Sequence, residues 1–310
     1  MSSQTVRRLA MFSSGAAAYG TAVYLFYSFY AQTPPTLHNH DDGSATTETS
    51  YITAPNRTDT FNDIAQCYDS EISREESVMG LPLLRRALLY FHSNQGSLLE
   101  VGAGTGRNID YYPKRVSKVV LTDSSEKMLL QARSKLKKSP DQRVQLFVAD
   151  AANMTRYYPP NTFDTVLDTF GLCSFDDPVK VLKELQTVCK PDGKILLLEH
   201  GTSKTWQGLA NFLDKNAERH AKNWGCVWNR DLDAIFDEAG LEIEQKDTWH
   251  FGTTYYVVAR PSARSNTEEW NAPTNANAYI NDVSDDASKK WKTIKWLRRR
   301  IFQWKNSQND

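Results

Sequence analysis

The chain has 310 residues, with 37 Lys and Arg against 37 Asp and Glu, so its formal net charge is +0. This balance argues against nucleic acid as the partner of the whole chain, because the phosphate backbone selects basic surfaces. The cysteines form no Cys-x-x-Cys pair and show no metal-ligand spacing, which argues against a disulfide framework or a zinc site. We therefore expect no metal site, and buried thiols in a reducing compartment at Cys67, Cys173, Cys189 and Cys226.

The amino terminus carries an uncharged segment from Leu9 to Ala31. It is long enough to cross a bilayer, which takes roughly 20 residues. Arg7 and Arg8 precede it, and no acid occurs before Asp41. This pattern predicts a mitochondrial presequence that continues into a transmembrane anchor over residues 1–31. The alternatives are a cleaved secretory signal and a location in the endoplasmic reticulum membrane.

A polar tether over residues 32–56 follows the predicted anchor, because Pro34-Pro35 ends the helix. We expect a single pass through the inner mitochondrial membrane. The basic residues before the anchor and Asp41-Asp42 after it would leave the amino terminus in the matrix by the positive-inside rule. Import through a presequence can override that rule, so the side of the membrane stays open.

A glycine-rich turn follows an apolar strand in the run Leu98–Asn108. Its glycines fall at every second position behind an acid, in the pattern Glu-x-Gly-x-Gly-x-Gly from Glu100 to Gly106. Residues without a Cβ permit a tight turn and a close approach of ligand to backbone. A dinucleotide fingerprint has the spacing Gly-x-Gly-x-x-Gly, so this turn predicts a nucleotide-like ligand of another kind. The alternative is a turn that only packs a strand against a helix.

Further apolar strands follow in a βα series, and three of them end in an acid. The predicted strands are Val119–Asp123, Val144–Asp150, Phe163–Asp168 and Lys194–His200. Asp123 lies roughly twenty residues past the glycines, where an acid can accept hydrogen bonds from both ribose hydroxyls. Asp150 is placed to accept from an adenine amino group. Each acid alone could be a helix cap, but three in register behind a glycine turn indicate a ligand site.

Apolar strands that alternate with helices predict a parallel sheet covered on both faces, within one α/β domain over residues 57–260. Ligands of such sheets bind at the carboxyl ends of the strands. The last two predicted strands, Leu241–Trp249 and Thr253–Ala259, are joined by a turn around Phe251-Gly252. That turn is too short for a parallel crossover, so these strands must be antiparallel.

The glycine turn resembles the S-adenosylmethionine (SAM) turn of class I methyltransferases. Other segments resemble the ubiquinone/menaquinone-type methyltransferases: Phe61–Asp69, Phe163-Asp164, Phe170–Leu172 and Lys190–Gly193. The run Leu198–Gly201, with Trp224–Cys226 and Asn229-Arg230, is more similar to the fungal mitochondrial Oms-type methyltransferase-like proteins and their animal thiol-methyltransferase relatives. The resemblance covers about residues 60–260. It implies SAM as cofactor and a Rossmann-like, mostly parallel seven-stranded sheet with an antiparallel carboxyl-terminal hairpin.

The expected SAM contacts combine the turn, the strand-end acids and a lid helix implied by the resemblance. They are Glu100, Gly102, Ala103, Gly104, Gly106, Asp123, Asp150, Ala151 and Tyr68. The enzyme would mainly align the methyl group with a nucleophile and exclude water. We name His200 as a general base or orienting group, because it follows a strand at the ligand face and imidazole titrates near neutrality. The alternative is a packing or capping residue, and Asp168 is a second catalytic candidate.

The carboxyl-terminal region divides into two parts. Residues 261–288 are polar and acidic and predict a flexible linker. Residues 289–305 predict a basic amphipathic helix, with apolar residues at three- and four-residue steps: Trp291, Ile294, Leu297, Ile301 and Trp304. Such a helix would lie on an anionic membrane surface. The alternatives are a contact with RNA, which we favour less, and a helix docked on its own domain.

The sequence is compatible with two functions. The first is a membrane-anchored mitochondrial SAM-dependent methyltransferase that acts on an unidentified acceptor, which is a small molecule, a lipid or quinone, a thiol or a protein. The second is a non-catalytic SAM-binding assembly factor or RNA-associated factor of mitochondria. The enzyme requires an acceptor pocket, expected between the amino-terminal helix, the 169–174 loop and the 201–230 insertion.

Overall fold

The computed structural model describes residues 57–262 and 281–282. The predicted anchor, tether and basic helix, and most of the predicted linker, lie outside these residues. Within the described residues, no helix is both long enough and apolar enough to cross a membrane.

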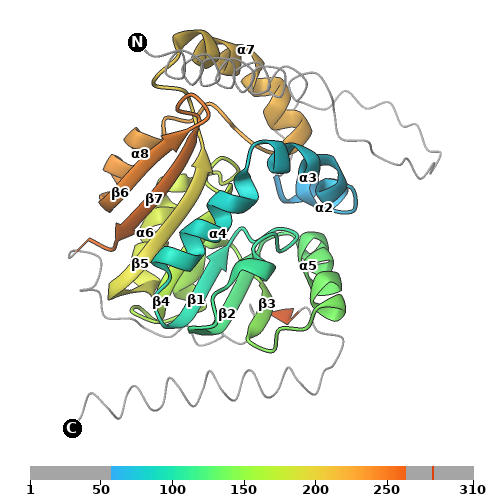
Figure 1. Ribbon diagram of the computed structural model, residues 1–310, viewed down its shortest axis with the longest axis vertical. Helices are drawn as coiled ribbons and strands as arrows, with labels where there is room; N and C mark the ends of the chain where they lie inside the picture. The colour runs from blue at the N-terminus through green and yellow to red at the C-terminus, as the bar shows by residue number, and fades with distance from the viewer. Residues whose placement is uncertain (1–56, 263–280, 283–310) are drawn as a thin grey trace, which may run out of the picture.

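The described chain alternates strands with helices, as the sequence predicts (Figure 1). The strands are β1 Gly96–Val101, β2 Val116–Asp123, β3 Val144–Val148, β4 Phe163–Thr169, β5 Cys189–His200, β6 Glu242–Trp249, β7 Thr254–Arg260 and β8 Asn281–Asp282. The α-helices are α2 Arg57–Ile64, α3 Tyr68–Val78, α4 Leu81–His92, α5 Glu126–Lys138, α6 Pro178–Val188, α7 Gln207–Trp224 and α8 Leu232–Ala239. Two short 3₁₀ helices complete the set, η1 Ile109–Tyr111 and η2 Ala151–Arg156.

These strands form one sheet in the order β6-β7-β5-β4-β1-β2-β3-β8. The pairs from β5 through β4, β1 and β2 to β3 are parallel, whereas β7 is antiparallel to both β5 and β6. This confirms the predicted Rossmann-like sheet of seven strands with its antiparallel hairpin. A further strand of two residues, β8, lies within the predicted linker and pairs antiparallel with β3.

The predicted turn Lys190–Gly193 lies inside β5 as an interruption of the register. Phe163 pairs with Cys189, but Thr165 pairs with Lys194, so the residues between Cys189 and Lys194 have no partner position on β4. The regular strand therefore begins at Lys194, where the sequence predicted it.

Apolar side chains cover the two faces of the sheet. On one face α6 and α8 pack over β4 and β5, with Val181, Leu185 and Phe236 buried. On the other face α4 packs over β5 and β7 and α5 packs over β2 and β3, with Leu88 and Leu129 buried. A third apolar cluster joins α2 and α3 to α7, and these helices lie together beyond one end of the sheet (Figure 1).

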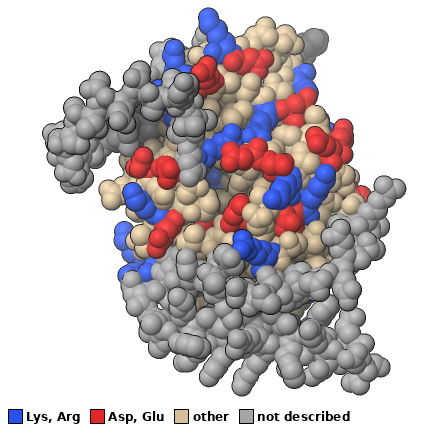
Figure 2. All heavy atoms as spheres, turned by 180° about the vertical axis from the view of Figure 1, so that it is seen from behind, with Lys and Arg blue, Asp and Glu red and all other residues tan. Residues whose placement is uncertain are grey.

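This arrangement fixes the position of the site. The strand order reverses between β1 and β4, and such switch points hold the ligands of open α/β sheets at the carboxyl ends of the strands. The glycine turn follows β1 at this point, and α2 and α3 lie nearby. Seen from behind the view of Figure 1, the described surface has basic and acidic side chains interspersed (Figure 2), consistent with the zero net charge.

Candidate active site

The glycine turn has the backbone conformation that its sequence predicts. Gly102 and Gly104 have φ of 55° and Gly106 has φ of 74°, in the left-handed region where residues with a Cβ are strained. A Cβ on Gly104 would meet nothing nearer than the carbonyl oxygen of Gly102 at 4.0 Å. A Cβ on Gly106 would instead clash with Ile109 and lie 2.9 Å from the Cβ of Ala132. Gly104 therefore leaves space for a ligand, whereas Gly106 allows the turn to pack on α5.

A cavity of about 570 Å³ opens beside this turn, within the usual size range of ligand sites. It runs between the carboxyl ends of the strands and the helices α2 and α3. Seven of the nine expected SAM contacts line it: Gly102, Ala103, Gly104, Asp123, Asp150, Ala151 and Tyr68. Glu100 and Gly106 are not among its lining residues.

The two strand-end acids have different surroundings. Asp123 accepts hydrogen bonds from the backbone N–H groups of Gly104 and Ser125, both at 2.8 Å, and burial raises its pKa. Asp150 is exposed and caps η2 by accepting from the N–H of Ala152 at 2.9 Å. Both acids therefore have the capping role that the sequence allowed, and both still line the cavity.

Glu100 lies behind the turn. Only 1% of its surface is exposed, and its carboxylate accepts hydrogen bonds from Asn108 at 3.0 Å and from Tyr112. Burial raises its pKa to about 7. The acid in front of the glycines therefore supports the loop from below instead of lining the ligand cavity.

Sequence reasoning missed a buried arginine at one end of the cavity. Arg85 is 4% exposed; its guanidinium pairs with Glu76 at 2.9 Å and donates to the Thr169 hydroxyl at 2.7 Å. The same guanidinium lies 4.9 Å from the centre of the Phe170 ring, and its Nε has no hydrogen-bonding partner among the described residues. Helix α4 reads as an ordinary amphipathic helix, so nothing in the sequence marked Arg85.

A second, smaller chamber of about 120 Å³ adjoins the first. The two share four lining residues, Phe61, Tyr68, Phe170 and Ser174. The smaller chamber is further lined by residues of the 169–174 loop and of the 201–230 insertion, including Cys173, Trp224 and Trp228. It lies among the segments for which the sequence predicts an acceptor pocket, and we call it the acceptor chamber.

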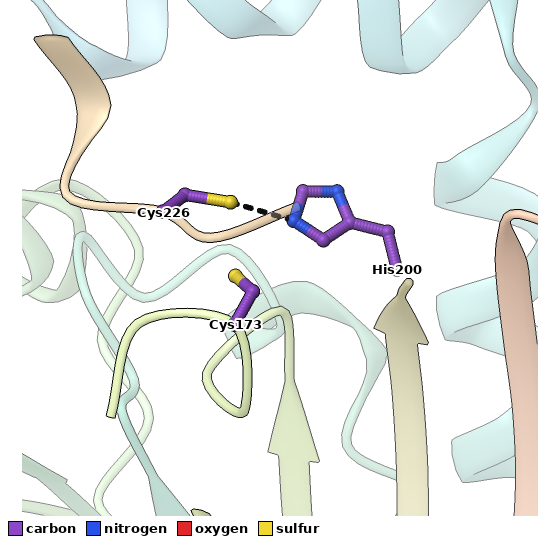
Figure 3. Close-up of side chains that lie close together, drawn as sticks. All are labelled: Cys173, His200 and Cys226. Carbon is purple, nitrogen blue, oxygen red and sulfur yellow. Dashed lines mark hydrogen bonds between the residues drawn. The ribbon is translucent and has the colours of Figure 1, made fainter. Parts of the chain in front are cut away.

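His200 lines the acceptor chamber at the end of β5. Its Nε2 lies 2.8 Å from the sulfur of Cys226, and the Phe170 ring packs edge-on against it with centroids 5.5 Å apart. Figure 3 shows the side chains of His200, Cys226 and Cys173 converging. Hydrogen bonding from Cys226 and the proximity of His200 lower the pKa of Cys173 well below its ordinary value.

Asp168, the other catalytic candidate, lines neither chamber. Its side chain is fully buried at the end of β4 beneath Gly102 and Gly171, and neither carboxylate oxygen has a hydrogen-bonding partner among the described residues. Burial, together with the negative charges of neighbouring groups, raises its pKa well above the ordinary value, as it does for Glu199 on β5. Asp168 is therefore placed under the site, without access to a ligand.

Comparison with known proteins decides the family. A model described as a methyltransferase domain matches residues 99–197. The ubiquinone/menaquinone biosynthesis C-methyltransferase UbiE of Bdellovibrio bacteriovorus is 31% identical over 164 residues, which cover 50% of this chain and 67% of that protein. The chain belongs to the class I SAM-dependent methyltransferases.

One further relative and one solved structure add detail. The mitochondrial methyltransferase OMS1 of Saccharomyces cerevisiae is 37% identical over 224 residues, or 67% of this chain and 47% of that protein. The chain thus spans about half the length of this relative. A solved complex of DhpI with SAH shares the fold, with 17% identity and a TM-score of 0.50 over 67% of this chain and 96% of that one.

SAM is the cofactor of this family, and the larger cavity suits it. Gly104 leaves the backbone open to a ligand, and Asp123 keeps lone pairs for ribose hydroxyls beyond the two backbone groups that it already accepts. The buried Arg85 lines the same cavity and offers a cation whose Nε has no hydrogen-bonding partner within the part of the chain that the structure describes. These features match a ligand with a ribose at one end and a carboxylate at the other.

Proposed function

We propose that this chain is a mitochondrial methyltransferase that transfers the methyl group of SAM to an acceptor held in the acceptor chamber. The observation that carries the proposal is the junction of the two chambers at Phe61, Tyr68, Phe170 and Ser174. A methyl donor in the larger cavity and a nucleophile in the smaller one would meet across this junction. Alignment of the two reactants is the main contribution that a protein makes to such a transfer.

The residues of the larger cavity have holding roles in this proposal. When bound, SAM supplies an electrophilic methyl group on a sulfonium. The glycine turn and Asp123 hold the ribose side, Asp150 and the backbone of Ala151 hold the adenine, and Arg85 attracts the carboxylate. The helices α2 and α3 cover the site and exclude water from it.

The acceptor chamber favours an acceptor whose nucleophilic atom is carried on a partly apolar group. Aromatic side chains line it together with two acids and two histidines: Phe61, Tyr68, Phe170, Trp224, Trp228, Glu75, Glu76, His200 and His220. Its volume of about 120 Å³ admits only a small part of an acceptor. A lipid, a quinone, a small thiol or a protein side chain could each present such a part. We place His200 on this side as an orienting group, because its Nε2 is already in contact with Cys226.

Transfer of label from methyl-labelled SAM tests the proposal. The full chain is incubated with lipid, quinone, small-thiol and protein fractions of mitochondria. Asp231→Ala serves as the matched control, because Asp231 caps helix α8 and lines neither chamber. We expect label to enter one fraction with the unaltered chain and the control, and not with Gly104→Val. A chain that binds SAM but labels none of the fractions would refute the enzyme and leave the non-catalytic assembly factor.

We further propose that Leu9 to Ala31 anchors the chain in the inner mitochondrial membrane. The uncharged length of this segment and the mitochondrial relative support this location. The chain should stay with the membrane pellet when mitochondria are extracted with alkaline carbonate. Its release into the supernatant would contradict the anchor, and protease treatment of mitoplasts would show which side the domain faces.

A further inference from the structure

Three side chains from distant parts of the sequence converge at the wall of the acceptor chamber. Cys173 lies in the turn after β4, His200 is the last residue of β5, and Cys226 follows α7. One nitrogen of His200 and the two sulfur atoms all lie within 4.8 Å of one another. In Figure 3 the three side chains point toward a common centre.

The backbone around this cluster holds it in place. The N–H of Val227 donates to the carbonyl of Cys173 at 2.9 Å, which ties the loop of one cysteine to the loop of the other. The edge-on Phe170 ring restricts the imidazole of His200. The two cysteines are 2% and 7% exposed, so solvent does not compete for their sulfur atoms. The donor atoms are therefore ordered by the fold before any ligand binds.

The donor set is that of a thiophilic metal. Thiolate and imidazole together suit Zn²⁺ and related transition-metal ions, whereas Mg²⁺ and Ca²⁺ require oxygen ligands. In tetrahedral zinc sites the S and N donors lie about 2.0–2.3 Å from the ion, and hence about 3.5 Å from one another. The Nε2 of His200 and the sulfur of Cys226, now 2.8 Å apart, would separate only slightly to reach this geometry.

We propose that Cys173, His200 and Cys226 bind one zinc ion. Because all three residues line the acceptor chamber, the fourth coordination position faces that chamber. Three protein ligands with one open position are typical of catalytic zinc sites, whereas structural sites have four. Ligand spacing along the chain could not reveal this site, because each donor comes from a different element. The site does not depend on methyl transfer, and its test is independent of turnover.

Metal content and metal affinity test the site directly. The full chain, free of any histidine tag, is stripped of metal and titrated with Zn²⁺ in competition with a chromophoric chelator. The variants are Cys173→Ala, Cys226→Ala and His200→Ala. The matched control is Cys189→Ala, because that cysteine is also buried but hydrogen-bonds to the Lys194 carbonyl far from the cluster. Calorimetry with SAM shows that each variant remains folded.

We expect one zinc per chain in the unaltered protein and in the control, and at least about a 100-fold loss of affinity in each ligand variant with SAM affinity retained. Cobalt in place of zinc should give a thiolate-to-metal charge-transfer band that disappears in the double cysteine variant. Absence of stoichiometric zinc binding in a chain that binds SAM would overturn the proposal. Unchanged zinc affinity in the three variants would overturn it equally.

Discussion

Asp123 accepts a hydrogen bond from the backbone N–H of Gly104 at 2.8 Å. This bond joins the acid at the end of β2 to the turn after β1, so the two strongest SAM signals of the sequence form one structural unit. The other carboxylate oxygen accepts from the N–H of Ser125, the residue that caps α5. Asp123 therefore shapes the turn in addition to facing the ligand.

Replacing Asp123 with Ala should weaken both SAM binding and folding. Loss of charge-assisted bonds to the ribose should cost about 1.5–3 kcal/mol of SAM binding, or roughly 10- to 100-fold in the dissociation constant. Calorimetry measures the affinity, and thermal unfolding measures the stability. Asp231→Ala is the matched control, because Asp231 caps α8 outside both chambers; it should lose about 1 kcal/mol of stability and no SAM affinity. If Asp123→Ala behaves like this control, Asp123 is a cap and nothing more.

The buried carboxyl of Glu100 should make stability depend on pH. Its pKa is about 7 in the fold and 4.5 in the unfolded reference, so the folded protein binds this proton more tightly. The free energy of unfolding should therefore fall as pH rises from about 4.5 to about 7. Glu100→Gln removes the ionisable carboxyl group. The fall in the free energy of unfolding between these pH values should therefore be smaller in this variant by about 1–3 kcal/mol. Denaturant unfolding of the unaltered chain and of Glu100→Gln at several pH values measures this difference. The same dependence of the free energy of unfolding on pH in both proteins would contradict the prediction.

The strands, the glycine turn and the strand-end acids were predicted because each is a local pattern. Leu98–Gly106 carries its apolar strand and its turn in one run, and the short connection at Phe251-Gly252 requires an antiparallel pair. The structural roles of Glu100 and Gly106 could not be predicted from the sequence. Both belong to the motif, but the Glu100 carboxylate is held by Tyr112, and Ile109 fills the space beside Gly106, so neither residue lines the cavity.

The acceptor side could be predicted only in outline. The expected segments do enclose a chamber, but its chemistry depends on tertiary contacts. Arg85 becomes notable only when the fold places it against Glu76 and Phe170, and Cys173 and Cys226 meet only because the loops after β4 and α7 converge. None of these contacts leaves a periodic or spacing signal in the sequence.

The predicted carboxyl-terminal helix is expected to bind membranes independently of the catalytic domain. Each cation near an anionic surface should contribute about 1 kcal/mol, and Trp291 and Trp304 should sit at the interface. A chain lacking residues 1–40 should bind anionic liposomes in a salt-dependent manner. Removal of residues 286–310 from that chain should abolish liposome binding and preserve SAM affinity. Loss of SAM binding or folding would show that the helix docks on the domain.

Calorimetric titration of the full chain with SAM, beside its Gly104→Val and Gly240→Val variants, tests the central claim. Both glycines have left-handed backbone, with φ of 55° and 66°, and a Cβ at either meets no atom closer than 4.0 Å. The two variants therefore carry similar backbone strain, but only Gly104 faces the cavity. We predict one SAM per chain in the unaltered protein and in Gly240→Val, and no detectable binding in a folded Gly104→Val. Equal SAM affinity in the two variants, or no binding to the unaltered chain, would contradict the account.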